Sequence, residues 1–181
     1  MKIESTPIPG LLLLEPAVHG DARGFFMETW RESFFTEHGI CHHFVQDNHS
    51  RSLRGTLRGL HYQLEYPQGK LVRVVRGEVY DVAVDLRHQS ATFGHWFGAP
   101  LSEDNRRQMW IPPGFAHGFY VLSESADLCY KCTEYYHPED DRSLLWNDPE
   151  IGIEWPLLDP SPILSERDRN APPLAQAPLP H

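Results

Sequence analysis

The chain has few cysteines and no long hydrophobic run. Three cysteines occur among 181 residues, and an odd number gives no framework of paired disulfides and favours a reducing compartment. The aliphatic run Leu11–Leu14 is too short to cross a membrane. The first residues lack the positive flank and the cleavage site of a signal peptide. We therefore expect a cytoplasmic protein.

Positive charge is scarce as well. Lys and Arg number 16 against 25 Asp and Glu, the net charge is −9, and no basic cluster is larger than the one at 51–58. This balance argues against a nucleic-acid partner, but it allows a local basic pocket for a small phosphorylated ligand. The length fits a single domain with a sizeable core, and no internal repeat is present.

Two cysteines, Cys129 and Cys132, form a C-x-x-C motif. The surrounding residues 128–136 have the pattern of a strand, in which positions three apart point to opposite faces. The sequence therefore favours buried, unreactive thiols over a redox or zinc site.

Short strands separated by Gly, Pro, Asn and Ser make up most of the chain. We expect strands at 11–15 (an edge strand), 25–30, 44–50, 57–63, 70–75, 78–86, 93–99, 107–111, 118–123 and 128–136. The pair Arg76–Gly77 suits a tight hairpin between two of them. One helix is expected at 31–38, closed by Gly39, and a shorter one at the S-x-x-D capping box of Ser165.

This pattern predicts an all-β fold, a jelly-roll barrel with a few short helices. We expect one domain over residues 1–170. From residue 171 to 181 the sequence is rich in proline and has no formally charged side chain. It is expected to form an extended or disordered C-terminal tail.

The densest group of ionisable residues lies between 57 and 86. Alternation places Asp81 and Asp85 on one strand face, which is either solvated or lines a polar cavity. Arg58, His61 and Lys70 belong to the same predicted antiparallel patch. His61 suits a general base, because histidine titrates near neutral pH. Lys70 can hold an oxyanion. The alternative for His61 is a histidine packed in the core, and the alternative for Lys70 is a lysine on the surface.

Uncharged polar groups and phenols suggest a second set of contacts. Gln46, Asn48 and Ser50 share one predicted strand face, which is either solvated or suited to orienting a sugar or a base. Tyr130 and Tyr136 are predicted to share another. A phenol there can donate a proton or stack on a base, although core or edge packing is the alternative.

A metal-binding pattern is only half present. Residues 111–117 contain P-x-G-x-x-H, ending at His117, which is the second motif of cupin barrels. The first motif needs H-x-H, and the corresponding His61-Tyr62-Gln63 lacks the second histidine. The number of candidate ligands alone does not exclude a metal site of two histidines and one carboxylate. However, no acidic residue lies at the expected spacing from the histidines on a matching strand face. We therefore expect no metal, with side chains supplying acid, base and charge.

Seven motifs run through the chain in a fixed order. They are D-x-R-G-F-F at 21–26, F-V-Q-D-N at 44–48, L-R-G-L-H-Y-Q at 57–63, G-x-V-x-D-V-x-V-D-L-R at 77–87, F-G-x-W at 93–96, P-x-G-x-A-H-G-F at 112–119 and L-S-x-[KR]-D at 164–168. Together they resemble the dTDP-4-dehydrorhamnose 3,5-epimerases of the cupin superfamily. The resemblance covers residues 2–173.

The resemblance implies a cofactor-independent isomerase of nucleotide-sugar biosynthesis. Its substrate would be dTDP-4-dehydro-6-deoxy-D-glucose, inverted at C3 and C5 to dTDP-4-dehydro-L-rhamnose. His61 would be the base, oriented by Asp168. Tyr130 would return a proton from the opposite face, and Lys70 would steady the enolate oxygen.

The resemblance also implies a set of substrate contacts and a partner. The expected contacts are Arg23, Glu28, Gln46, Asp47, Asn48, Arg58, His117, Tyr136, Asp141 and Arg167, with Asp81 behind His117. The family forms homodimers in which the N-terminal strand reaches the partner's site. It commonly has lysine where this chain has Arg167 and glutamate where this chain has Asp141, so these two contacts depart from the pattern.

Three other functions compete with this interpretation. An epimerase acting at one carbon would use the same base and tyrosine. A metal-dependent cupin enzyme such as a dioxygenase would require stoichiometric metal. A non-catalytic sugar-binding cupin would not need His61, Tyr130 and Asp168 together.

Overall fold

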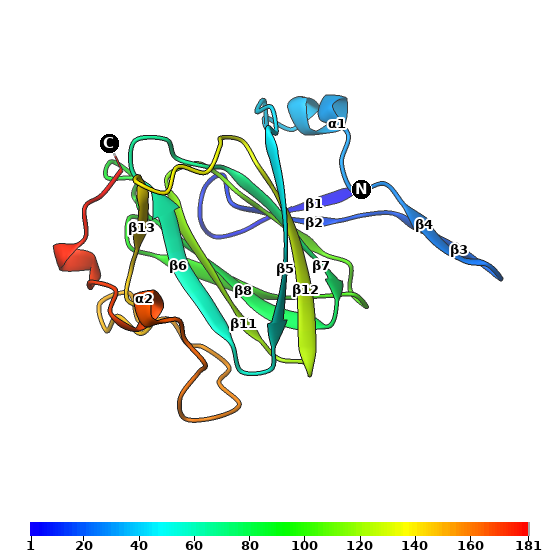
Figure 1. Ribbon diagram of the computed structural model, residues 1–181. Helices are drawn as coiled ribbons and strands as arrows, with labels where there is room; N and C mark the ends of the chain where they lie inside the picture. Colours follow the sequence, from blue (N-terminus) through cyan, green and yellow to red (C-terminus); the bar gives the residue numbers. More distant parts are fainter. Residues whose placement is uncertain (181) are drawn as a thin grey trace.

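The computed structural model describes residues 1–180 as two antiparallel β-sheets packed face to face (Figure 1). The six-stranded sheet has the order β1 (Lys2–Ser5), β2 (Leu12–Glu15), β10 (Gln108–Ile111), β7 (Lys70–Arg76), β12 (Ser125–Cys132) and β5 (Gln46–Leu53). The five-stranded sheet has the order β13 (Asp141–Ser143), β6 (Leu57–Gln63), β11 (Phe115–Val121), β8 (Glu78–Asp85) and β9 (Trp96–Ser102). The predicted all-β jelly-roll class is confirmed.

Strand alternation determines where the two hydrophobic clusters lie. On β8, Val79 and Ala83 point between the sheets and join the main core. Val82 and Val84 point to the outer face of the five-stranded sheet, where they join a second cluster. Both faces of β8 are therefore covered, which explains why buried valine and alanine residues occur on both sides of the strand.

The expected hairpin at Arg76–Gly77 is wrong. β7 and β8 belong to different sheets, so the chain crosses from one sheet to the other at Gly77. Gly77 has φ +76°, and a Cβ there would lie 2.1 Å from the carbonyl oxygen of Ser125. A glycine is thus needed here because the backbone passes close to β12, and not because it forms a two-residue turn.

Two further strand predictions need correction. Residues 12–15 form an inner strand, because β1 pairs outside them and β10 on the other side. The last predicted strand ends at Cys132, so Tyr136 lies in the following loop and does not share a strand face with Tyr130. The opposite orientations of Cys129 and Cys132 are consistent with their exposure, since Cys132 is buried and Cys129 is partly exposed.

The helices are short: one follows the fourth strand and the others lie in the C-terminal part of the chain. They are α1 (Glu32–Glu37), α2 (Glu166–Arg169) and the 3₁₀ turn η1 (Leu174–Gln176). Within residues 1–180, no helix has the length and apolar character needed to span a bilayer. Residues 171–180 are largely extended, as expected, but they pack on the body: Leu174, Ala177 and Leu179 contact the second cluster. His181 lies outside the described residues.

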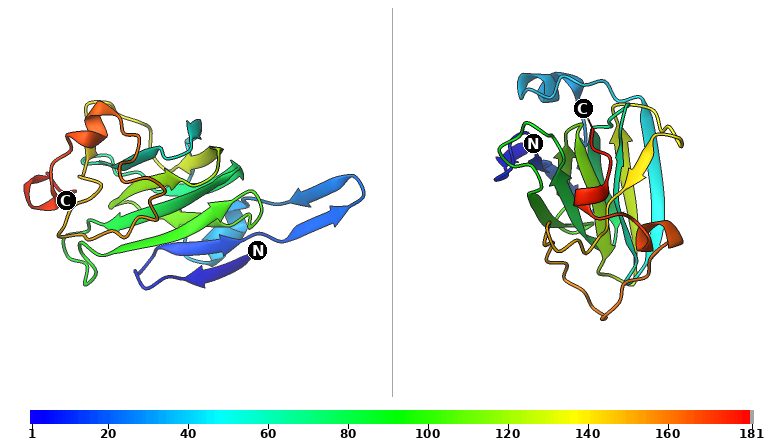
Figure 2. Two further views of the ribbon diagram at one scale, coloured as in Figure 1. Left: turned by 90° about the horizontal axis from the view of Figure 1, so that it is seen from below. Right: turned by 90° about the vertical axis from the view of Figure 1, so that its left-hand side faces the viewer.

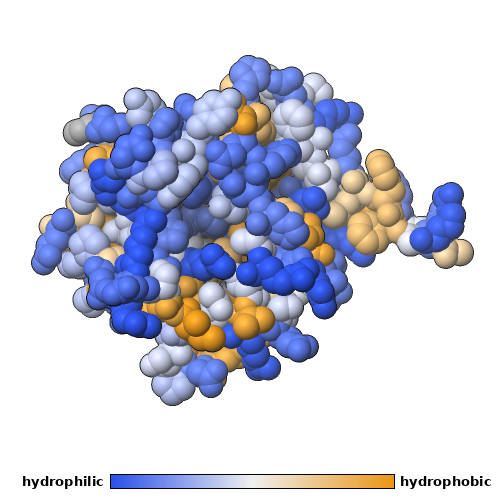
Figure 3. Space-filling view, in the orientation of Figure 1, coloured by the Kyte–Doolittle hydropathy of each residue, from blue (hydrophilic) through white to orange (hydrophobic). Residues whose placement is uncertain are grey.

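A two-stranded arm projects from the body. It is the hairpin of β3 (Val18–Asp21) and β4 (Gly24–Met27), which extends away from both sheets in Figure 1 and in the left view of Figure 2. Phe25 and Phe26 on β4 are 58% and 70% exposed. The space-filling view likewise shows hydrophobic residues along the arm (Figure 3). A projecting arm with exposed aromatic rings is typical of a contact with another chain.

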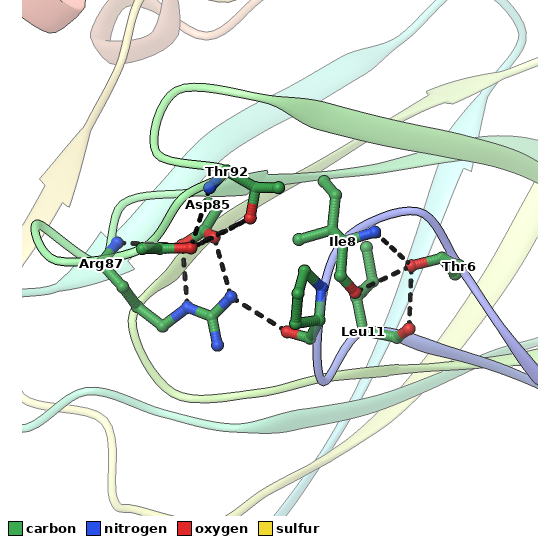
Figure 4. A network of polar contacts seen from close by, with 8 residues as sticks. Thr6, Ile8, Leu11, Asp85, Arg87 and Thr92 are labelled. Carbon is green, nitrogen blue, oxygen red and sulfur yellow. Dashed lines mark hydrogen bonds and ion pairs between the residues drawn. The ribbon is translucent and has the colours of Figure 1, made fainter.

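A buried carboxylate ties the loops at one end of the sandwich (Figure 4). Asp85 accepts hydrogen bonds from Arg87 at 2.7 and 2.8 Å, from Ser90 Oγ at 2.6 Å and from Thr92 Oγ1 at 2.7 Å. Arg87 also donates to the backbone oxygen of Pro9 at 2.9 Å. The β1–β2 loop is thereby fixed to the end of β8.

Candidate active site

A cavity of about 130 Å³ lies between the two sheets. Its walls come from β5, β6, β7, β11 and β12, and its lining residues are Ser50, Arg58, His61, Lys70, His117, Gly118, Phe119, Leu128 and Tyr130. A wider cleft of about 440 Å³ shares Arg58 and His61 with it and reaches Asp168 and Arg167. The predicted base, cation and phenol therefore meet in one place, although they come from both sheets rather than from one antiparallel patch.

A third hollow, of about 340 Å³, opens on the other face of the six-stranded sheet. Its lining includes Asp47, Asn48, Arg73, Tyr130 and Lys131, but neither His61 nor Lys70. Of these three hollows, only the cavity of about 130 Å³ combines His61 with Lys70, so it is the candidate site.

Two glycines allow β6 and β11 to approach closely beside the cavity. Gly59 has φ +131°, and a Cβ there would lie 2.5 Å from Cα of Gly118. The strand register shifts at this point, while His117 and His61 remain paired. The irregularity explains why Arg58 and His61, three residues apart, both line the cavity.

His61 is held by a buried carboxylate. Its Nε2 lies 2.6 Å from Asp168 Oδ1, and the Asp168 side chain is 3% exposed whereas that of His61 is 32% exposed. Ser165 caps α2 as the sequence predicted, since its Oγ accepts from the Asp168 backbone N–H at 3.0 Å. The cap and the one-turn helix thus fix where the carboxylate meets the imidazole.

Asp168 stays ionised despite its burial. Burial favours the neutral carboxyl, but hydrogen bonds from His61 and Ser165 outweigh it and hold the pKa of Asp168 below its ordinary value. An ionised partner stabilises the imidazolium that forms when His61 accepts a proton.

A second histidine–carboxylate pair lies deeper in the same cavity wall. His117 Nε2 is 2.9 Å from Asp81 Oδ2 and 3.1 Å from Oδ1. Asp81 is fully buried and His117 is 7% exposed. The pair predicted from the sequence is therefore formed, and it orients the His117 ring towards the cavity.

Lys70 is a buried lysine that faces the cavity. It is 9% exposed, it lines the cavity, and no residue among 1–180 forms a hydrogen bond or ion pair with its ammonium group. Burial lowers the pKa of Lys70, against the opposing charges of Asp141 and Asp81. A buried ammonium that faces a cavity is a ready donor to an anionic oxygen of a bound ligand.

Tyr130 enters the cavity from β12. Burial raises the pKa of its phenol to about 12. The group therefore keeps its proton at neutral pH, as a proton donor must. His61 belongs to the five-stranded sheet and Tyr130 to the six-stranded sheet, so the two groups come from opposite walls.

A polar network borders the wider cleft. Asp141 on β13 accepts hydrogen bonds from Tyr136 Oη at 2.9 Å and from Arg167 Nη1, and Arg167 Nε donates to Ser143 Oγ at 2.7 Å. Burial opposes ionisation of Asp141, but the Arg167 hydrogen bond prevails and lowers its pKa. On β5, Gln46 donates to Asn48 at 3.1 Å and accepts from the Tyr136 backbone N–H at 2.9 Å.

Sequence comparison identifies the family. The family model described as dTDP-4-dehydrorhamnose 3,5-epimerase matches residues 5–176. The chain belongs to the dTDP-4-dehydrorhamnose 3,5-epimerase family. A curated member from Pseudomonas aeruginosa is 57% identical over 180 residues, covering 98% of each chain.

Solved structures of the epimerase family have the same fold. The dTDP-6-deoxy-D-glucose-3,5-epimerase of Legionella pneumophila, in complex with dTDP-4-keto-L-rhamnose, superposes with a TM-score of 0.96 at 52% identity over 99% of this chain and 97% of that one. A 3'-monoepimerase from Streptomyces bikiniensis, in complex with dTDP-quinovose, gives a TM-score of 0.86 at 38% identity over 94% and 86%. The fold alone therefore does not separate double from single epimerases.

Seven of the ten predicted contacts line neither the cavity nor the adjoining cleft within one chain. Four of them, Gln46, Asn48, Tyr136 and Asp141, form the polar network described above, and the other three are paired elsewhere. Asp47 is on the other face of β5 from Gln46 and Asn48, and it pairs with Lys131 at 3.0 Å. Arg23 sits on the arm, 90% exposed and paired with Asp21, and Glu28 follows the arm and pairs with Arg31. The structure does not bring these three to the candidate site of their own chain.

Some residues that shape the site received no role from the sequence. Gln63 fixes two loops, since its Nε2 donates to Tyr66 O and Tyr135 O and its Oε1 accepts from His137 N. Ser143 and Phe119 were missed as well. Gln63 and Phe119 lie within the family motifs, which was the one available signal, whereas nothing local marked Ser143 as a partner of Arg167.

Proposed function

We propose that this protein is a dTDP-4-dehydrorhamnose 3,5-epimerase, which converts dTDP-4-dehydro-6-deoxy-D-glucose to dTDP-4-dehydro-L-rhamnose. The observation that carries the proposal is the convergence of His61, Lys70 and Tyr130 on one cavity, with buried Asp168 behind the histidine. Both C3 and C5 flank the C4 ketone, so loss of either proton leads to an enolate on the same oxygen. One set of side chains can therefore serve both inversions.

His61 acts as the base and Lys70 holds the developing oxyanion. Lys70 has no carboxylate partner among residues 1–180, so its charge is available when the ketone becomes an enolate. An interaction that strengthens as charge develops lowers the barrier to proton removal. The His117–Asp81 pair provides a second oriented donor near the ketone.

Tyr130 returns the proton on the other side of the sugar. Inversion requires removal from one face and delivery to the opposite face, which a single histidine cannot do. The position of Tyr130 on the opposite wall and its raised pKa of about 12 support this assignment.

The nucleotide lies along the polar groups that border the cavity. We assign the diphosphate to Arg58 and Arg167, because planar guanidinium groups bind phosphate in two-point contacts. Gln46, Asn48 and Tyr136 face the same region and would hold the nucleoside, with Asp141 nearby. Asp47 is paired on the far face of β5, so we give it at most an indirect role.

The active form is a homodimer with exchanged arms. Arg23 and Glu28 lie on or beside an arm that projects from its own body (Figure 2), and the exposed Phe25 and Phe26 need a partner surface. A second copy of the chain would receive this arm and gain both side chains for its site. We place the catalytic domain at residues 1–170, with 171–181 as a tail, and the reaction in the cytosol, which suits three free thiols.

The identity of the product tests the function. NMR of the sugar formed from dTDP-4-dehydro-6-deoxy-D-glucose should show inverted configuration at both C3 and C5. Inversion at one carbon alone would establish the single-epimerase alternative, and no conversion would overturn the proposal. Full activity after exhaustive chelation is expected for this cofactor-independent mechanism; loss with EDTA and recovery with one divalent ion would instead support a metal-dependent cupin.

A further inference from the structure

We propose that the C-terminal segment 171–180, here called the strap, is a positioning element that keeps Asp168 in contact with His61. It does so through two residues outside the cavity, Asp148 and Tyr62. The inference rests on the proposed function, since it concerns the orientation of the catalytic base. Neither Asp148 nor Tyr62 lines the cavity or the adjoining cleft.

The helix that carries Asp168 cannot hold its own position. α2 has four residues, which is a single turn, and isolated helices this short are not stable in water. Its Asp168 is nevertheless placed within 2.6 Å of His61 Nε2. The required rigidity must come from the segments on both sides of the turn.

The incoming segment is anchored to the start of β6. Ile163 forms a bridge with Thr56, in which its N–H donates to Gly55 O at 2.8 Å and its C=O accepts from Leu57 N–H at 3.0 Å. This bridge fixes the chain five residues before Asp168. Arg167 adds contacts to Asp141 and Ser143, so the front of the turn is well held.

The outgoing segment is anchored by the strap. The Pro172 carbonyl accepts from Leu145 N–H at 2.9 Å, and the Leu174 N–H donates to Asp148 Oδ2 at 2.6 Å. Asp148 is 2% exposed and its other oxygen accepts from Glu150 N–H at 2.7 Å. The buried carboxylate of Asp148 thus fixes the strap by a hydrogen bond just after α2.

The far end of the strap is attached to the strand of the base itself. Tyr62 Oη donates to Pro178 O at 2.5 Å, and Tyr62 is 3% exposed. Tyr62 points to the outer cluster, together with Leu174 and Leu179, while its neighbour His61 points into the cavity. The strap is therefore hydrogen-bonded to the outer face of β6, at the residue next to the catalytic histidine.

Three variants separate positioning from general stability. A chain ending at Asn170 removes the strap, Asp148→Asn removes one carboxylate acceptor, and Tyr62→Phe removes only a hydroxyl. Tyr80→Phe is the matched control, because Tyr80 packs in the same outer cluster and its hydroxyl has no hydrogen bond within residues 1–180. If the shortened chain does not fold, the two point variants carry the test.

We expect kcat to fall by about ten- to a hundredfold in the shortened chain and by a smaller factor in each point variant, since a displacement near 1 Å can cost two orders of magnitude. KM should change by less than about twofold, because neither residue contacts the cleft. In an Asp168→Asn background, the same strap variants should lower kcat only slightly further, because the effects of residues that act through one contact are not additive. Tyr80→Phe should match the native enzyme.

A readout independent of turnover keeps this inference distinct from the proposed function. In protein labelled with ¹⁵N-histidine, the His61 ring resonance is identified by its loss in His61→Asn. In strap variants it should move towards its position in Asp168→Asn. A native-like resonance with unchanged kcat, or kcat losses that simply add to that of Asp168→Asn, would overturn the positioning role. A shifted resonance in a protein without epimerase activity would refute the function alone.

Discussion

At the scale of single residues, burial distinguishes three similar histidine–aspartate pairs. His61–Asp168 stands at the cavity wall, and His117–Asp81 is buried beside it. The third pair joins His49, whose side chain is 58% exposed, to Asp127, which Arg51 also holds through bonds of 2.6 and 2.7 Å. The third pair lies away from the cavity and so provides a natural control.

The first prediction concerns the base. His61→Ala should lower kcat by about a hundredfold or more, in the range of a lost general base, because the variant has no imidazole at the position that Asp168 orients. His49→Ala should leave kcat within about twofold. Steady-state kinetics with circular dichroism on both proteins measure this. Near-native turnover in folded His61→Ala would remove the histidine from the mechanism.

The second prediction concerns the carboxylate behind the base. Asp168→Asn keeps the shape but loses the charge that stabilises the imidazolium, so kcat should fall substantially but less than in His61→Ala. The double variant should be no worse than His61→Ala alone. Additive losses would show that Asp168 does not act through His61.

At the scale of elements, one turn of helix has a direct functional role. Ser165→Ala removes the side-chain cap of α2, which typically costs about 1 kcal/mol. Because α2 carries Asp168 and little of the core, we expect this cost to appear mainly as a several-fold lower kcat with a nearly unchanged melting temperature. Ser165→Thr should restore activity. A fall in melting temperature without a change in kcat would place the cap outside the catalytic geometry.

The Asp85 network should make stability depend on acid pH. Burial opposes ionisation of Asp85, but hydrogen bonds from Arg87, Ser90 and Thr92 prevail and lower its pKa to about 2. A folded-state pKa below the unfolded value stabilises the protein above about pH 4, and this contribution disappears as pH falls towards 2. Asp85→Asn should therefore cost about 2 kcal/mol at pH 7. Urea unfolding at several pH values should show the difference narrowing below pH 4; a constant difference would contradict it.

The sequence predicted strand positions better than strand partners. The strand pleat is a local property, so residues two apart on β8 share a face: Val79 and Ala83 lie between the sheets, and Val82 and Val84 lie in the outer cluster. The hairpin at Gly77 was wrong because partner choice depends on which sheet each strand joins, and a glycine that serves a close approach looks the same as one in a turn. The S-x-x-D cap was confirmed because capping is local too.

The site could be predicted only in part, for the same reason. Motifs located His61 and His117, and the group of ionisable residues between 57 and 86 included Lys70. The structure brings all three to one cavity. The Arg167–Ser143 contact joins residues 24 positions apart through the fold, so no local pattern marked it. Arg23 and Glu28 could not be placed within one chain at all, because the arm leaves its own body.

At the scale of the whole molecule, the arm predicts that each site is built from two chains. Arg23→Glu damages the site reached by the arm, whereas His61→Ala damages the site of its own chain. In a one-to-one mixture, half of the dimers would be mixed and each would contain one intact site, so about a quarter of native activity should return after subunit exchange. Activity assays of the refolded mixture measure this.

The control is a mixture of His61→Ala with Asp168→Asn, which damage the same chain's site and should not complement. If Arg23→Glu and His61→Ala also fail to complement while each remains dimeric in sedimentation, the arm serves its own chain and the exchange is refuted.

The central claim is that base and acid act on opposite faces of the sugar, and solvent exchange tests it most directly. In deuterated water, the native enzyme should place deuterium at both C3 and C5 of the product, as read by NMR. Tyr130→Phe should still exchange substrate protons through His61 and Lys70, while net inversion falls by about a hundredfold or more. Equal losses of exchange and inversion in Tyr130→Phe would contradict the account.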